Sequence, residues 1–378
     1  MSTPAPPRRT SSGWVVGHVA GAPVILAPSW LVAVAVLTAL SVPAARALTG
    51  LEGSAVWVVA LAFVVLLFAS VFLHEVAHGL VARARGQQPH EFVLTLWGGH
   101  TAFGGAAPTP ATNAIVAIVG PAVNLLLGAL FWGALALDVV PRGTVLWALL
   151  WSGAVTNGFV GVFNLLPGLP LDGGRVLEAA VWAATKSRYT GTVAAGWVGR
   201  VVAAGVVVWA LLGPLSGGAS SVVDVMWAVL IGVFLWSGAS AAIRSARSQR
   251  NVEGVTLDSV GHRAVTVGHG DSLAHAGAVA AAAGVQDVVL LSPDGRPAAY
   301  VDRAAAASVP AQVAGSTPVT AVSVPLPVGA TVDGTLVGHA LLNDLARATR
   351  LSPVVVALVD GRVAGLVRAS DVIAAIRA

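Results

Sequence analysis

Long apolar runs recur along the first two thirds of the chain and are separated by short polar segments. Six of these runs approach or exceed the roughly 20 residues that an α-helix needs to cross about 30 Å of hydrocarbon. They cover residues 22–45, 55–82, 112–137, 145–166, 194–213 and 222–243. The pattern predicts six membrane-spanning helices. The first is expected to be a retained span, because no small-residue cleavage site follows a short apolar core.

After Arg250 the apolar runs shorten to strand length, and charged residues are spread among them. No segment there is long enough to cross a bilayer. The pattern therefore predicts a membrane region over residues 14–250 and a soluble domain over residues 251–378. Residues 1–13 are polar and rich in Pro and Ser, so we expect a disordered tail.

The predicted soluble domain contains an internal repeat. The segment VVLLSPDGR, which begins at Val288, is echoed sixty-six positions later by VVVALVDGR, which begins at Val354. Each copy predicts a strand, a tight Asp-Gly turn and a second strand, flanked by Ala-rich helical sequence. Each copy is too small to bury a core of its own, so the two should pack together. The pattern resembles a pair of CBS domains, at about residues 255–315 and 316–378.

CBS pairs commonly bind adenine nucleotides, through a Thr or Ser that is followed three residues later by an Asp. This chain has Arg368 and Asp371 at those positions in one copy, and Asp302 and Ala305 in the other. Neither copy matches fully. Two alternatives therefore remain for the CBS pair. It could bind an adenine nucleotide, or its role could be purely structural or dimerising.

Composition and charge agree with a membrane location. Of the 378 residues, 56% are hydrophobic and only 10% are charged. Basic residues lie at every second boundary of the predicted spans, namely Arg8, Arg9, Arg83, Arg85, Arg175, Arg244, Arg247 and Arg250. The positive-inside rule then predicts a multi-pass protein of the cell membrane, with both termini and the soluble domain in the cytoplasm. The basic residues form no long cluster with interleaved aromatics, so no nucleic-acid partner is expected.

The strongest chemical signal is His74-Glu75-Val76-Ala77-His78, which fits H-E-x-x-H. Imidazoles at i and i+4 lie on one face of a helix and can share a metal ion, while the Glu is close enough to activate a water molecule. The chain has no cysteine, so a metal site must use His and carboxylates. Polar residues inside an apolar span are costly without partners. The alternative is that His74, Glu75 and His78 only form hydrogen bonds to neighbouring helices.

A catalytic zinc ion takes three protein ligands and leaves a fourth position open, so a third ligand is needed. The best candidate is Asp172, at the end of the segment NLLPGLPLD that begins at Asn164. Prolines and a Gly pair break the fourth helix there, and such irregular backbone is tolerated at membrane depth where protein or a polar cavity surrounds it. An alternative role for Asp172 is to cap a helix or turn. His90 and His100, in a loop, are not expected to be ligands.

HEVAH in one apolar span and NLLPGLPLDGG in a later one resemble the site-2 protease family of intramembrane zinc metalloproteases, peptidase family M50. GPAVN, from Gly120 to Asn124, fits this family too, and so does the stretch around Trp97-Gly98-Gly99, which in the family lies in a membrane-associated β-hairpin loop. A Leu165-Leu166 pair replaces a frequent Asn-Pro dipeptide, a minor departure. The expected fold is a multi-pass α-helical membrane protein with this hairpin, plus a soluble α/β CBS pair.

The resemblance implies a zinc ion held by His74, His78 and Asp172, with Glu75 as general base and Asn164 as a polar group near the scissile carbonyl. It also implies regulated intramembrane proteolysis of membrane-associated proteins. The substrates expected from the family are anti-sigma factors, sigma-factor precursors or signal-peptide remnants. The CBS pair would modulate activity, hold the substrate or form a homodimer.

Residues 88–108 alternate like an edge strand and are expected to receive the substrate by strand addition. Two other functions remain as alternatives. One is a CBS-regulated transporter that uses Glu75 and Asp172 as an ion pathway, although such a pathway has no need for His at i and i+4. The other is a catalytically inactive scaffold, although every proposed catalytic residue is present.

Overall fold

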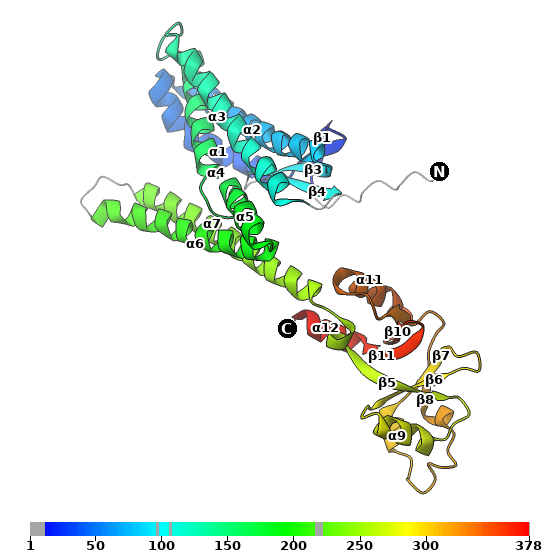
Figure 1. Ribbon diagram of the computed structural model, residues 1–378. Helices are drawn as coiled ribbons and strands as arrows, with labels where there is room; N and C mark the ends of the chain where they lie inside the picture. The colour runs from blue at the N-terminus through cyan, green and yellow to red at the C-terminus, as the bar shows by residue number, and fades with distance from the viewer. Residues whose placement is uncertain (1–11, 96–97, 106–107, 216–221, 378) are drawn as a thin grey trace. The chain divides into compact units, whose positions relative to one another are not determined.

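The computed structural model of the protein describes residues 12–95, 98–105, 108–215 and 222–377. The chain forms two compact units, Met1–Ala246 and Arg247–Ala378 (Figure 1). Nearly all of the tail that was expected to be disordered, residues 1–13, lies outside the described residues.

Six helices in the described part of the chain are long and apolar enough to cross a membrane. They are α1 (Pro28–Thr49), α2 (Gly53–Ala84), α3 (Pro110–Ala136), α4 (Val145–Asn164), α6 (Arg188–Leu215) and α7 (Val222–Glu253). Large apolar side chains such as Leu126, Trp132 and Val233 are exposed on their outer faces. Such a surface suits hydrocarbon better than water. The expected multi-pass membrane region is thus confirmed.

Local sequence explains where several of these helices begin and end. α1 starts at Pro28, whose missing N–H costs nothing in the first turn, and ends at Gly50, which takes the left-handed conformation (φ 66°). Thr109 and Thr144 cap α3 and α4, because the hydroxyl of each accepts a hydrogen bond from the N–H three residues later. These signals place the helix ends within a few residues of the apolar runs.

The start of the first apolar run is a strand, so the prediction of one helical span from residue 22 was wrong there. β1 (Trp14–Val19) and β2 (Ala22–Leu26) form an antiparallel hairpin, and α1 begins only at Pro28. β2 also pairs in parallel with β3 (Gln87–Thr95). A buried strand and a helix can share the same apolar composition, and the distant pairing partner decides between them.

The hairpin expected in residues 88–108 is present as β3 and β4 (Gly98–Gly105), which pair antiparallel. It is not isolated, because the four strands form one sheet in the order β1-β2-β3-β4. β3 and β4 both pack against α2. The sheet therefore places β4 beside the helix that carries HEVAH.

The break after α4 leads into a short helix, α5 (Asp172–Thr185). The loop folds back tightly on the start of this helix, since a Cβ added at Gly173 would collide with the carbonyl oxygens of Leu165 and Leu166. Asp172 is the first residue of α5 and is held by this close approach.

The second unit is an α/β unit with one seven-stranded sheet, in the order β8-β7-β6-β5-β11-β10-β9. Its strands are β5 (Gly261–Gly268), β6 (Asp287–Leu291), β7 (Pro297–Val301), β8 (Ser323–Pro325), β9 (Thr331–Asp333), β10 (Val354–Val359) and β11 (Arg362–Arg368). Its helices are α8 (Leu257–Val260), α9 (Leu273–Ala282), α10 (Arg303–Ala307), α11 (Gly338–Ala348) and α12 (Ala369–Arg377), with a 3₁₀ turn at Val319–Val322. Both predicted strand-turn-strand repeats are present, as β6–β7 and β10–β11.

The two repeats are joined through the sheet and through one buried ion pair. β5 of the first repeat pairs antiparallel with β11 of the second. Asp287 is 1% exposed and accepts hydrogen bonds from Arg303 in its own repeat and Arg368 in the other, each with an N–O distance of 2.7 Å. Burial raises the pKa of Asp287, but the hydrogen bonds from Arg368 and Arg303 lower it more, so the pKa lies below its ordinary value.

We expect Asp287→Asn to destabilise the second unit by about 1–3 kcal/mol at neutral pH, because two arginines lose their carboxylate partner. A carboxyl whose pKa is lower in the folded state stabilises the fold while it is charged. The difference from wild type should therefore be complete above about pH 4 and shrink as the pH falls below that value. Hydrogen exchange of the β6 and β11 amides in the full chain measures this.

The matched control is Asp360→Asn, which changes an exposed carboxylate in the turn between β10 and β11. This variant should exchange like wild type. Equal protection in Asp287→Asn and in the control would contradict the role of the buried pair.

Candidate metal centre

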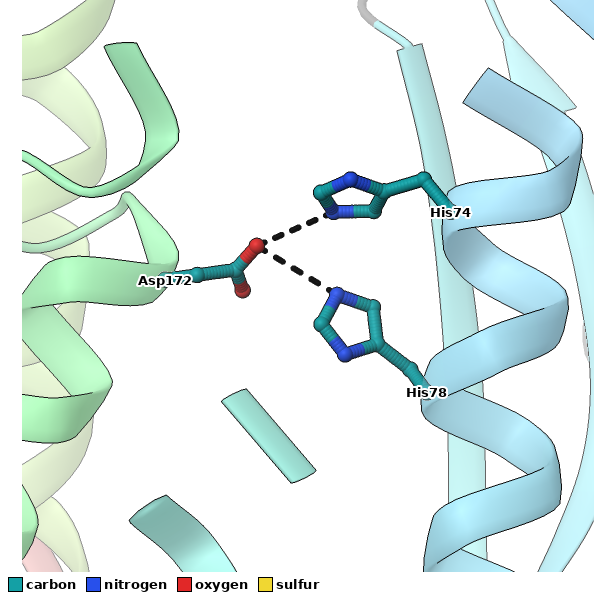
Figure 2. A group of neighbouring side chains, drawn as sticks. All are labelled: His74, His78 and Asp172. Atoms are coloured by element: carbon teal, nitrogen blue, oxygen red, sulfur yellow. Dashed lines mark hydrogen bonds and ion pairs between the residues drawn. The ribbon is translucent and has the colours of Figure 1, made fainter. Parts of the chain in front are cut away.

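Two helices bring three side chains to one point (Figure 2). His74 and His78 lie one turn apart on α2, and Asp172 points at them from the first turn of α5. The Oδ2 atom of Asp172 lies 3.0 Å from His74 Nε2 and 3.3 Å from His78 Nε2. One potential ligand atom from each residue lies within 4.8 Å of the other two. The three side chains predicted as ligands thus come together from positions 98 residues apart.

Each imidazole uses its other nitrogen to bond the protein. His74 Nδ1 donates to Asn124 Oδ1 at 2.5 Å, and His78 Nδ1 donates to the carbonyl oxygen of Val116 at 2.6 Å. A proton on Nδ1 leaves the Nε2 lone pair free to bind a metal ion. Two such nitrogens and a carboxylate oxygen are a ligand set that suits zinc.

A buried chain of hydrogen bonds holds Asn124, the partner of His74, in place. Asn124 Nδ2 donates to Asn157 Oδ1 at 2.9 Å, and Asn157 Nδ2 donates to Ser70 Oγ at 3.0 Å. The two asparagines are 0% and 1% exposed. The chain thereby links α3 and α4 back to α2, the helix of His74. The sequence indicates Asn124 only as part of the GPAVN motif, and it assigns no role to Asn157 or Ser70. The available signal was that all three are polar residues within apolar spans.

The space between the two imidazoles is kept open by Gly120 on α3. A Cβ added there would lie 2.5 Å from His74 Nε2 and would also collide with His78 Nε2. The backbone of α3 thus approaches the two nitrogen atoms without a side chain in between. This opening, together with the orientation of both rings, fits a metal ion bound at the three residues.

Glu75 and Asn164 line the same cavity of about 390 Å³ as the three ligand candidates. Glu75 Oε2 accepts a hydrogen bond of 2.8 Å from the hydroxyl of Thr101 on β4. Asn164, at the end of α4, donates one amide hydrogen to the carbonyl oxygen of Val160 at 3.0 Å. Thr101 was missed from the sequence, because only the sheet brings it beside Glu75.

His90, on β3 of the hairpin, is not part of this group. His90 lies against Gly104 of β4, where a Cβ would collide with its Nε2 atom. The side chain of His100 lies outside the described part of the chain. Among the described residues, the group that could hold a metal ion is His74, His78 and Asp172.

We expect Gly120→Ala to weaken zinc binding, because the added methyl group collides with both Nε2 atoms. Overpacking of this kind costs about 1–3 kcal/mol, or roughly 5- to 150-fold in affinity. Competition with a chromophoric chelator measures this. The control is Gly133→Ala on the same helix, where a Cβ meets nothing within 4 Å. Equal zinc affinity in the two variants would contradict this account of the opening.

Parts of the chain are similar in sequence to known proteins. Residues 138–208, which include Asn164 and Asp172, match the family model of Peptidase family M50. Rip3 of Mycobacterium tuberculosis, whose name describes a zinc metalloprotease, is 36% identical over 203 residues, 53% of this chain and 51% of that protein. The chain spans about half the length of the curated relatives that it matches.

Two solved structures are similar to different parts of the chain. The site-2 protease from Methanocaldococcus jannaschii is 23% identical, covers 62% of this chain and 96% of its own, and has a TM-score of 0.43. The CBS domain of a CBS-domain-containing membrane protein from Sphaerobacter thermophilus is 14% identical, covers 36% of this chain and 96% of its own, and has a TM-score of 0.27. With the family match and the curated relatives, the predicted resemblance to peptidase family M50 is confirmed.

Proposed function

We propose that this chain is a zinc metalloprotease that hydrolyses peptide bonds in or near the membrane-spanning segments of membrane-associated proteins. The observation that carries this proposal is the convergence of His74, His78 and Asp172 beside Glu75, in one cavity of a helical unit apolar enough to span a membrane. The match to Peptidase family M50 and the zinc metalloprotease name of the relative support it.

The ligands proposed for zinc are the Nε2 atoms of His74 and His78 and the carboxylate of Asp172. When bound, zinc supplies a Lewis acid that lowers the pKa of water towards about 7 and polarises a carbonyl group. Asn124 and the carbonyl of Val116 hold the two imidazole rings in the orientation that this requires.

Glu75 is the proposed general base. As a water oxygen bonds to the substrate carbonyl carbon, the Glu75 carboxylate takes the water proton and later passes it to the amide nitrogen, whose bond to the carbon breaks. The Thr101 hydroxyl occupies one lone pair of Oε2 and orients the carboxylate in the cavity. Thr101 is therefore a positioning residue in this scheme.

Asn164 is the proposed donor to the oxyanion that develops on the substrate. Its amide has two N–H groups, and Val160 accepts only one of them. The other is available to a substrate in the cavity that Asn164 lines together with Glu75.

The substrate must present an extended backbone, because the hydrogen bonds of a helix shield its amide groups. We propose that it adds as a strand beside β4, as the alternating pattern of residues 88–108 suggested. β4 is the last strand of the described four-stranded sheet and carries Thr101 next to Glu75. Main-chain hydrogen bonds along such an edge align a peptide independently of most side chains.

The wider setting of this proposal is regulated intramembrane proteolysis at the cell membrane. Arginines at every second span boundary support cytoplasmic termini and a cytoplasmic second unit. Anti-sigma factors, sigma-factor precursors and signal-peptide remnants are the proposed substrate classes, and the CBS pair is proposed to modulate cleavage or to form a homodimer. Arg368 stands at one of the positions through which CBS pairs commonly bind an adenine nucleotide, but its guanidinium is bonded to the buried Asp287.

Glu75→Gln should retain about one zinc ion per chain and lose cleavage by a factor of about 10² or more, because the ligands remain and the base is lost. The double variant His74→Ala/His78→Ala should lose both the metal ion and cleavage. Elemental analysis of the detergent-purified protein and cleavage of a transmembrane reporter give the two readouts. Full cleavage by Glu75→Gln, or full zinc content in the double variant, would refute the proposal.

Asn164→Ala should lower kcat by about 10²–10³ with unchanged zinc content, since one oxyanion donor contributes about 3–4 kcal/mol. The matched control is Asn343→Ala, an exposed asparagine of the second unit. Unchanged turnover in Asn164→Ala would remove Asn164 from the mechanism.

A further inference from the structure

Arg200 is a charged residue on the potential span α6 with no carboxylate partner in the described part of the chain. Its Nε and Nη2 atoms both donate to the hydroxyl of Ser240 on α7, at 3.1 and 3.0 Å. The guanidinium carbon lies 4.7 Å from the ring centroid of Trp197 and 5.2 Å from that of Trp236. A neutral hydroxyl does not balance the charge, so the group keeps a net positive charge.

The surface around this arginine faces outward and is apolar. The two tryptophans are 51% and 48% exposed, and Val201 and Val233 nearby on the same helices are more exposed still. A cation that faces hydrocarbon is costly unless it reaches the headgroup layer, and tryptophan also favours that layer. We therefore place Arg200 at the level of the lipid headgroups.

The sequence of α7 also places Arg200 at the level of the lipid headgroups. Arg244 follows Ser240 by four residues on α7, so it lies on the same face and about 6 Å further along the helix axis. Arg244 is exposed, and the arginines at the end of α7 begin with it. Two cations thus lie about one helical turn apart at the edge of an apolar surface.

We infer that Arg200, flanked by Trp197 and Trp236, binds the phosphate of an anionic phospholipid, with Arg244 as a second contact. The planar guanidinium retains donors that Ser240 does not use, and such donors match phosphate oxygens. The acyl chains would cover the exposed apolar side chains beside it, which a free phosphate ion cannot do. A zwitterionic headgroup would bind less well, because its own ammonium group offsets the phosphate.

The site also lies next to the loop that carries Asp172. A Cβ added at Gly199, the neighbour of Arg200, would collide with the carbonyl oxygen of Leu169, and one at Gly238 would lie 2.6 Å from Pro170. α6 and α7 therefore close on this loop at the level where Arg200 meets Ser240. A lipid bound to both helices there would stabilise that packing. Lipid binding itself does not depend on the proposed protease activity.

Native mass spectrometry of the full chain in neutral detergent tests the inference. Wild type should retain one phosphatidylglycerol in preference to phosphatidylcholine. Arg200→Gln should lower this preference about tenfold, because charge-assisted hydrogen bonds to the phosphate are lost. The matched control Arg142→Gln changes an exposed arginine between α3 and α4 and should behave like wild type.

A second variant, Arg244→Gln, tests the inference even if Arg200→Gln fails to fold. Arg244→Gln leaves the contact between Arg200 and Ser240 in place, and it should lower the preference about three- to tenfold. Equal retention of phosphatidylglycerol in wild type and in both Arg200→Gln and Arg244→Gln would overturn the inference. So would displacement of the lipid by inorganic phosphate in wild type, which would mean that the site takes the free anion.

Discussion

Polar groups placed among apolar helices must find partners within the protein, and the metal centre depends on how His74 and His78 meet this constraint. Each ring directs Nδ1 to an acceptor on α3, the side chain of Asn124 or the carbonyl oxygen of Val116. Both Nε2 atoms then face Asp172. The bonds that satisfy buried groups are therefore also the bonds that orient the ligands and pack α2 against α3.

Close approach of backbone determines the rest of the cavity. Gly120 lets α3 lie directly against the two imidazoles, and Gly173 lets the chain fold back before α5 so that Asp172 reaches them. On the other side, the sheet brings the Thr101 hydroxyl to the carboxylate of Glu75. The proposed base and the two histidine ligands share α2, but different elements orient their side chains, β4 for Glu75 and α3 for the imidazoles.

The second unit meets a related constraint, because it buries a charged group. Its two repeats share one sheet, and the joint between β5 and β11 lies beside the buried carboxylate of Asp287. Burial of a single carboxylate would be unfavourable, but Arg303 and Arg368 compensate its charge from both repeats. The buried ion pair therefore joins the two repeats of the second unit.

The sequence by itself determined the features that depend on neighbours along the chain. Apolar runs predicted the helices, H-E-x-x-H predicted two imidazoles on one helix face, and the two Asp-Gly turns predicted the paired strands of the second unit, because helix and hairpin periods are local. Asp172 was also predictable, from a broken helix at a similar expected depth. The strand at Ala22–Leu26 and the partners Asn157, Ser70 and Thr101 were decided only by the tertiary structure. A strand needs its neighbour, and a buried amide or hydroxyl needs its acceptor. Both come from distant parts of the chain, and only the packing of the whole unit brings them together.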